Sequence, residues 1–92
     1  MSLETLTTKY IASAEKVLKE LEPSQEPITV TDESVISILS YIRDYLEDAK
    51  YYKVQGKLET SLTSVAYCEG LLDALRLLGA VKFEWPTNQR EK

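Results

Sequence analysis

Histidine is absent from this 92-residue sequence, and cysteine occurs once, at Cys68. Imidazole is the commonest general base near neutral pH and the commonest transition-metal ligand, so its absence excludes histidine-based catalytic triads and zinc sites that contain histidine. A lone cysteine also excludes an internal disulfide, which favours a reducing compartment. Catalysis would have to depend on carboxylates, tyrosines, lysines or one thiol. We therefore assign no catalytic residue, no metal ligand and no cofactor.

Clustered positive charge and long apolar runs are missing as well. Eleven Lys and Arg residues are scattered among fifteen Asp and Glu residues, giving a net charge of −4. Proteins that bind nucleic acid usually carry a basic stripe instead. No apolar run approaches the ~20 residues that cross a bilayer, and the N-terminus lacks a signal-peptide pattern. We expect a cytoplasmic protein that binds neither nucleic acid nor membrane.

The length suits one domain and is too short for two. A hydrophobic content of 43% is typical of a globular chain. We expect a single domain over residues 1–86, followed by a flexible polar tail at 87–92.

Three segments have the residue spacing of amphipathic helices, at about 2–21, 32–54 and 57–78. In the first, the apolar residues recur at intervals of three and four, so they share one face. They are Leu3, Leu6, Tyr10, Ile11, Ala14, Val17, Leu18 and Leu21.

Local signals mark the ends of these helices. Ser2 is suited to cap the first helix, and Thr31 or Asp32 the second. Gly56 and Gly79 are suited to end the second and third, because glycine accepts the left-handed backbone that commonly follows a helix.

The two connections differ in kind. Residues 23–31 contain two prolines, and Ile28 and Val30 alternate with polar residues there, so we expect this linker to lie extended against the bundle. Residues 55–57 alone separate the second helix from the third. Such a short connection predicts that these two helices run antiparallel.

The predicted fold is therefore all-α: an up-and-down three-helix bundle with a short extended C-terminal tail. Its core is expected where the three apolar stripes meet. In the first half of the third helix we expect burial of Leu58, Leu62, Val65 and Cys68. Replacing Leu39, Ile42 or Leu72 by alanine should each cost ~2–5 kcal/mol.

Two parts of the chain carry a family resemblance. The stretch Tyr45–Tyr52, with Gly56 after it, and the more specific run Tyr67–Gly79 resemble the archaeal family called domain of unknown function 357. The resemblance implies a short archaeal protein, folded as a left-handed up-and-down three-helix bundle, with no assigned activity. Copies appended to a nucleotidyltransferase-like domain imply an accessory role, but this chain has no room for such a domain.

A polar strip follows the apolar stripe along the third helix. Glu69, Asp73 and Arg76 continue the line of Leu58, Leu62 and Val65. Folding the third helix back on the second places Glu69 near Arg43. One interpretation is an ion-pair network, with Glu69 paired to Arg43 and Asp73 to Arg76. The other is a ligand-binding or enzymatic site.

Tyrosines on one flank of the second helix could belong to the same ligand-binding or enzymatic site. Tyr41, Tyr45, Asp48 and Tyr52 share helical spacing. Tyrosines at the edge of an apolar stripe usually pack their rings and leave the hydroxyl in water, although the same arrangement could stack a ligand ring. The complete candidate ligand site is Tyr45, Asp48, Glu69, Asp73 and Arg76.

The leucines near the end of the third helix give a second candidate site. Leu77 projects away from Leu71 and Leu75, so one face cannot bury all three. Either the tail folds over Leu77, or apolar surface remains for a partner. The candidate partner-binding residues are Ala74, Leu77, Phe83 and Trp85.

The leading functional hypothesis is a non-enzymatic helical module that docks onto a second copy, as a homodimer, or onto another protein. The alternative is the small-ligand or enzymatic site between the second and third helices. No motif fixes a reaction class, a substrate or a partner.

Overall fold

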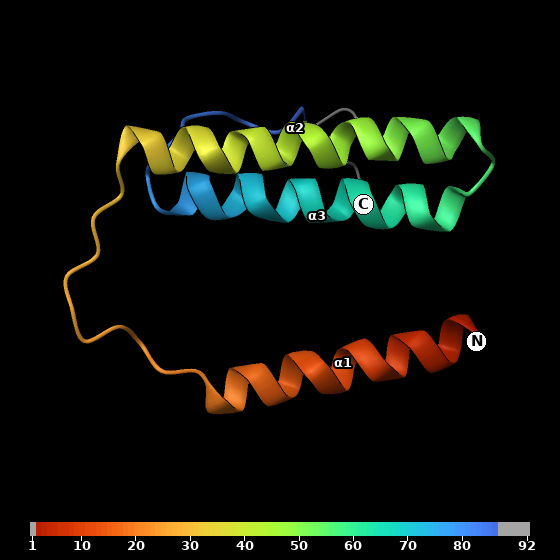
Figure 1. Ribbon diagram of the computed structural model, residues 1–92, viewed down its shortest axis with the longest axis horizontal. Coiled ribbons are helices and arrows are strands. Elements are labelled where there is room, and N and C mark those ends of the chain that lie inside the picture. The colour runs from red at the N-terminus through yellow and green to blue at the C-terminus, as the bar shows by residue number, and fades with distance from the viewer. Residues whose placement is uncertain (1, 87–92) are drawn as a thin grey trace.

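The computed structural model describes residues 2–86, in which three helices and no strand occur (Figure 1). The helices are α1 (Leu3–Glu20), α2 (Asp32–Val54) and α3 (Leu58–Leu77). The predicted all-α class and the up-and-down order of three helices are confirmed, with each helix end within one residue of its expected place. The predicted tail at 87–92 lies outside the described residues.

Side-chain caps begin the first two helices. The Ser2 hydroxyl accepts a hydrogen bond from the backbone N–H of Thr5 at 3.0 Å. The Thr31 hydroxyl accepts one from the backbone N–H of Ser34, also at 3.0 Å. Thr31 is thus the cap of α2, and Asp32 is its first helical residue, where a carboxylate favours the positive end of the helix dipole.

Glycine ends the second and third helices as expected. Gly56 and Gly79 both have φ of 77°, a left-handed conformation that costs glycine little. After α2, the backbone N–H of Lys57 donates to the carbonyl oxygen of Tyr52 at 2.9 Å, and the same pattern follows α3. These bonds satisfy carbonyls that each helix end would leave unpaired.

The helices α2 and α3 form an antiparallel hairpin, and the core lies between them. Its central cluster of buried side chains is Ile42, Cys68 and Leu75, each at most 6% exposed. Half-buried apolar residues surround this cluster: Ile38, Leu39, Tyr45, Leu71, Leu72, Ala80 and Val81. The sequence-based expectation that Leu39, Ile42 and Leu72 contribute to the core is confirmed.

Near the turn, small residues let the two helices approach closely. Ala49 is 2% exposed and Ser61 is 8% exposed. The Ser61 hydroxyl donates a hydrogen bond to the carbonyl oxygen of Ala49 at 2.6 Å. This bond satisfies the one buried polar side chain of the described core and joins α3 directly to the backbone of α2.

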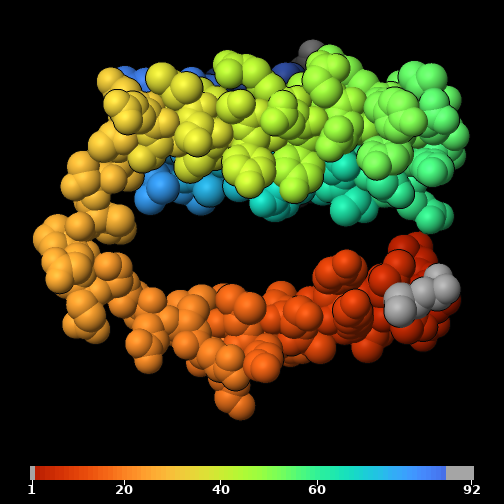
Figure 2. All heavy atoms as spheres, in the orientation of Figure 1, coloured from red at the N-terminus to blue at the C-terminus, as the bar shows by residue number. Residues whose placement is uncertain are grey.

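The helix α1 contacts neither α2 nor α3 within the described residues, and none of its residues is buried. Figure 2 shows the open space between α1 and the hairpin. The expectation that all three apolar stripes meet in one core was therefore wrong: only those of α2 and α3 do. Two leucines expected inside, Leu58 and Leu62, are 63% and 68% exposed. They lie roughly 80–120° around α3 from Cys68, on a flank that α2 does not cover.

The linker explains how α1 is held apart. Leu21, the residue that follows the last turn of α1, has an extended backbone (φ −64°, ψ 150°), and residues 21–31 contain no regular structure. Ile28 is 83% exposed and Val30 is 52% exposed, so the linker does not lie against the hairpin as expected. Pro23 and Pro27 favour this extended path, since proline fixes its own φ and restricts the residue before it.

Candidate functional site

The C-terminal tail is fastened to the polar strip of α3. The indole N–H of Trp85 donates to a carboxylate oxygen of Asp73 at 2.8 Å. The same oxygen lies 3.3 Å from a guanidinium nitrogen of Arg76. The Arg76 guanidinium in turn lies 5.7 Å from the centre of the Phe83 ring, and Phe83 and Trp85 meet edge to face at 5.0 Å. These four side chains form one cluster, the tail clasp.

The tail clasp leaves Leu77 uncovered. We expected the tail either to fold over Leu77 or to leave it free for a partner, and Leu77 is 78% exposed. Helix geometry explains the outcome, because Leu77 is rotated ~100° from Arg76 and points away from both α2 and the tail. Ala74 is exposed on the same helix, whereas Phe83 and Trp85 are half-buried in the clasp.

The five residues of the candidate ligand site lie on two sides of the hairpin. Tyr45 meets Tyr67 edge to face, with ring centres 4.6 Å apart. Tyr67 and Glu69 are rotated ~100° in opposite directions from the buried Cys68, so they occupy opposite flanks of α3. Tyr45 therefore lies on one side of the hairpin, with Asp48 one turn further along α2. Glu69 lies on the other side with the clasp.

The ion pairs of the described residues support the structural interpretation of the strip in part. Asp73 pairs with Arg76, as expected. A pair between Glu69 and Arg43 is not among them; the second one joins Lys50 to Glu47 at 3.1 Å. Both pairs are between residues three apart on one helix and substantially exposed, so each contributes at most about 1 kcal/mol.

Cys68 occupies the centre of the core. It is 3% exposed, and its thiol donates a hydrogen bond to the carbonyl oxygen of Ile42 at 3.4 Å. Burial raises the pKa of this thiol, a backbone hydrogen bond lowers it by a smaller amount, and the carboxylates of Glu69 and Asp48 raise it further. A thiol with a raised pKa stays protonated at neutral pH and is a poor nucleophile, which fits a packing role.

We expect the Cys68 thiol to react with an aromatic disulfide reagent at pH 8 at least about a hundredfold more slowly in the folded chain than in denaturant, because reaction requires opening of the hairpin. The raised pKa of the folded thiol also determines how folding stability changes with pH. Because the unfolded thiol ionises at a lower pH, the stabilisation from Cys68 is complete below the unfolded pKa of about 8.5 and is lost as the pH rises above it. Equal labelling rates in the two states would contradict this picture.

No group of three or more acidic, cysteine or histidine residues suited to hold a metal occurs within residues 2–86. None of the helices there is long and apolar enough to cross a membrane. Two open clefts lie at the ends of α3. One, of about 410 Å³, is lined by residues 56–60, and the other, of about 630 Å³, lies between Arg76, Gly79 and the tail.

Besides the flank of α3 that carries Leu58 and Leu62, two apolar surfaces lack a covering element among the described residues. The first, the α1 face, is the apolar side of α1. Five of its members are between 55% and 73% exposed: Leu3, Tyr10, Ile11, Val17 and Leu18.

The second surface, named the tyrosine groove, is the partly exposed face along the contact line of α2 and α3, on the side opposite the tail clasp. Tyr41 and Tyr45 stack with ring centres 6.2 Å apart, and Tyr45 meets Tyr67. Along α3, Leu71, Ala74 and Leu78 follow Tyr67 at helical spacing and continue the groove. Tyr41 is 60% exposed, Tyr67 49% and Leu78 66%.

The α1 face is turned toward the hairpin. A cleft of about 520 Å³ lies between the two, lined by one residue of α3, Thr63, and by six of α1: Leu3, Leu6, Thr7, Tyr10, Ile11 and Ala14. The groove could have been found in the sequence from the spacing of Tyr67, Leu71, Ala74 and Leu78. The tail clasp had a weaker signal, the alternation of Val81, Phe83 and Trp85.

These features define a class: a small all-helical protein built on a helical hairpin, with exposed apolar faces. The sequence model of the family described as "Protein of unknown function (DUF357)" matches residues 9–81, most of the chain, and the protein belongs to this family. No curated protein and no solved structure matches the chain significantly.

Proposed function

We propose that this protein is a non-enzymatic protein-interaction module. The observation that carries the proposal is α1, a helix with a continuous apolar face and no buried residue. An isolated helix of this length is marginal in water, because most helix stability in proteins comes from packing of the apolar face. Packing against another protein surface would supply that stability.

The hairpin adds further apolar surface to the proposal. Leu77 and Ala74 are exposed near the C-terminal end of α3, and the tyrosine groove runs beside them. Contiguous apolar surface beyond a few hundred Å² is unusual in a monomeric protein and marks interaction sites.

The alternative, a small-ligand or enzymatic site, receives less support from the geometry. Tyr45 and Asp48 lie across the hairpin from Glu69, and Asp73 and Arg76 are engaged by Trp85 and Phe83. These contacts favour a structural role for the strip, which is to hold the tail.

The proposal is tested by affinity capture with matched variants of the tagged chain. We expect the wild-type chain to retain a stoichiometric protein, either a second copy or another polypeptide, and Tyr10→Asp on the α1 face to lose it. Thr8→Asp adds the same charge on the opposite side of α1 and should retain it. Leu77→Lys tests the end of α3 in the same way.

Two results would overturn the proposal. One is a wild-type chain that is monomeric at high concentration and captures no protein in stoichiometric amount. The other is a bound protein that neither Tyr10→Asp nor Leu77→Lys releases, since the surfaces identified above would then not be the ones used.

A further inference from the structure

The α1 face and the tyrosine groove are complementary surfaces carried by the same chain. The α1 face is a single helical stripe, and the groove lies between two antiparallel helices. The side of α3 that faces α1 carries small exposed residues, Thr63, Gly70 and Ala74, so a third helix could approach closely there. Large side chains on α1, such as Tyr10, would then fill the space that small residues on α3 leave.

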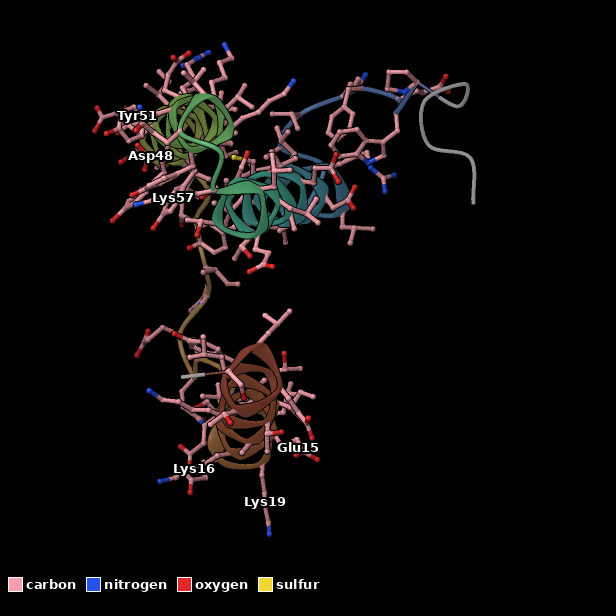
Figure 3. All side chains as sticks on the ribbon, turned by 90° about the vertical axis from the view of Figure 1, so that its right-hand side faces the viewer. Glu15, Lys16, Lys19, Asp48, Tyr51 and Lys57 are labelled. Carbon is pink, nitrogen blue, oxygen red and sulfur yellow. The ribbon has the colours of Figure 1, made fainter. Side chains whose placement is uncertain are left out.

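The edges of the two surfaces also carry charges of opposite sign. Figure 3 looks along the helices, and Glu15 and Lys19 point away from the hairpin, so the apolar side of α1 is turned toward it. In the same view Lys16 of α1 and Asp48 of α2 project to the same side. An α1 helix seated in the groove in this orientation therefore turns toward α2 the edge that carries Lys16, with Glu20 one turn further along it.

The lysines of this edge meet an acidic edge of α2. Lys9 lies two turns before Lys16 on the same edge of α1, and Asp44 lies one turn before Asp48 on the edge of α2. Lysines and aspartates would then line the two sides of one contact. Opposite charges at the rim of an apolar contact fix its orientation and register.

The linker decides which copy of α1 fills the groove. Pro23 and Pro27 stiffen residues 21–31, and Ile28 and Val30 are 83% and 52% exposed, so little burial holds the linker folded. Proline-containing linkers act as semi-rigid extended spacers. In this extended form each chain offers both surfaces at once, and exchange of an identical element between two chains is a low-cost route to a dimer.

The area is sufficient for a stable contact. An 18-residue helix is ~27 Å long and ~11 Å wide, so one seated α1 covers ~300 Å² on each of the two facing surfaces. The two seated helices of a reciprocal dimer therefore bury ~1,200 Å² in total. Stable specific interfaces begin at about that total area. A reciprocal exchange of α1 therefore reaches the threshold, whereas a single seated helix would bury half as much.

We propose that two copies of this protein exchange α1, so that the α1 face of each chain occupies the tyrosine groove of the other. This inference rests on the proposed function and names its partner as a second copy. The exchanged dimer is symmetric and covers all the exposed apolar residues of the α1 face and the groove.

The test uses full-length chains and light scattering after size exclusion. We expect the wild-type chain to be a dimer. Tyr10→Asp on the α1 face and Ala74→Glu in the groove should each raise the dimer dissociation constant at least tenfold. Their matched controls, Thr8→Asp and Leu62→Glu, introduce the same charge outside the contact, since Leu62 is 68% exposed on the opposite flank of α3, and they should leave the dimer intact. Circular dichroism verifies that every variant keeps its helices.

Mixing the two variants distinguishes exchange of α1 between chains from packing of α1 on the hairpin of its own chain. A Tyr10→Asp chain with an intact groove and an Ala74→Glu chain with an intact α1 can share one undamaged contact. With different tags, the mixed chains should associate more tightly than either chain associates with itself, because each homodimer has no undamaged contact. A second pair of chains reverses the charges. One chain carries Lys9→Glu and Lys16→Glu, and the other carries Asp44→Lys and Asp48→Lys. This pair should prefer the mixed dimer, in which both contacts have opposite charges.

Three results would overturn the exchange: a monomeric wild-type chain, a dimer unaffected by both Tyr10→Asp and Ala74→Glu, or defective chains that associate no more tightly when mixed than each does alone. A monomer that still captures another protein through Tyr10 would overturn the exchange and leave the proposed function standing. A monomer that captures nothing would overturn both.

Discussion

We expect Leu75→Ala to lower the free energy of unfolding by about 2–5 kcal/mol, the range for truncating a buried leucine. Leu75 is 2% exposed and lies in the one apolar cluster that joins α2, α3 and the tail. A chain of this length has about 5–14 kcal/mol of stability in total. With so few fully buried side chains among the described residues, it belongs at the low end, so this single change should unfold a measurable fraction of molecules at 37 °C.

The matched control for that experiment is Leu77→Ala. It makes the same chemical change two residues further along the same helix, at a side chain that is 78% exposed. It should change the unfolding free energy by no more than about 0.5 kcal/mol. Urea unfolding followed by circular dichroism measures both, and similar losses for the two variants would mean that Leu75 is not in the core.

The second large effect is expected from adding volume at the closest approach of the hairpin. Ala49 is 2% exposed, and its carbonyl oxygen accepts the 2.6 Å hydrogen bond from Ser61. Ala49→Leu would force α3 away from α2, breaking this bond and loosening the core beyond it. Overpacking of this kind costs about 1–3 kcal/mol, and the lost hydrogen bond about 1 kcal/mol more.

Ser40→Leu on the exposed side of α2 is the control for Ala49→Leu, since it adds a leucine to the same helix without entering the hairpin. Its unfolding free energy should stay within about 0.5 kcal/mol of wild type. If Ala49→Leu is as stable as Ser40→Leu in thermal and urea unfolding, α2 and α3 are not in close contact at Ser61.

The helices could be predicted from the sequence because their limits are set locally. Ser2, Thr31, Gly56 and Gly79 act on backbone groups within a few residues of themselves. The core positions on α2 followed from periodicity, because a short connection leaves antiparallel neighbours few ways to pack. Local chemistry thus explains most of the fold.

The position of α1 could not be predicted in this way. A periodic stripe shows that a helix has an apolar face, but not which surface covers it or in which chain that surface lies. The long linker leaves this choice open, because each doubling of loop length changes the closure free energy by only about 0.6 kcal/mol. The same reasoning applies to Leu58 and Leu62, which lie on an apolar stripe that no element within residues 2–86 covers.

For the candidate ligand site, contacts between neighbours on one helix could be predicted from the sequence, but the arrangement of its residues in space could not. The Asp73–Arg76 pair follows from helical spacing alone. The separation of Tyr45 from Glu69 depends on the rotation of α3 about its axis, which is set by the burial of Cys68 against Ile42. The bond from Trp85 to Asp73 joins residues twelve apart through a tail without periodic structure, so no sequence pattern specified it.

Trp85 is the one tryptophan of the chain, whereas the tyrosines are six in number and none lies in the tail. Light at 295 nm excites indole selectively, so emission from Trp85 reports on the clasp that its N–H makes with Asp73. Circular dichroism at 222 nm reports on the helices. One sample heated once therefore yields two transition curves, and the gap between their midpoints measures how tightly residues 81–85 are coupled to the helices.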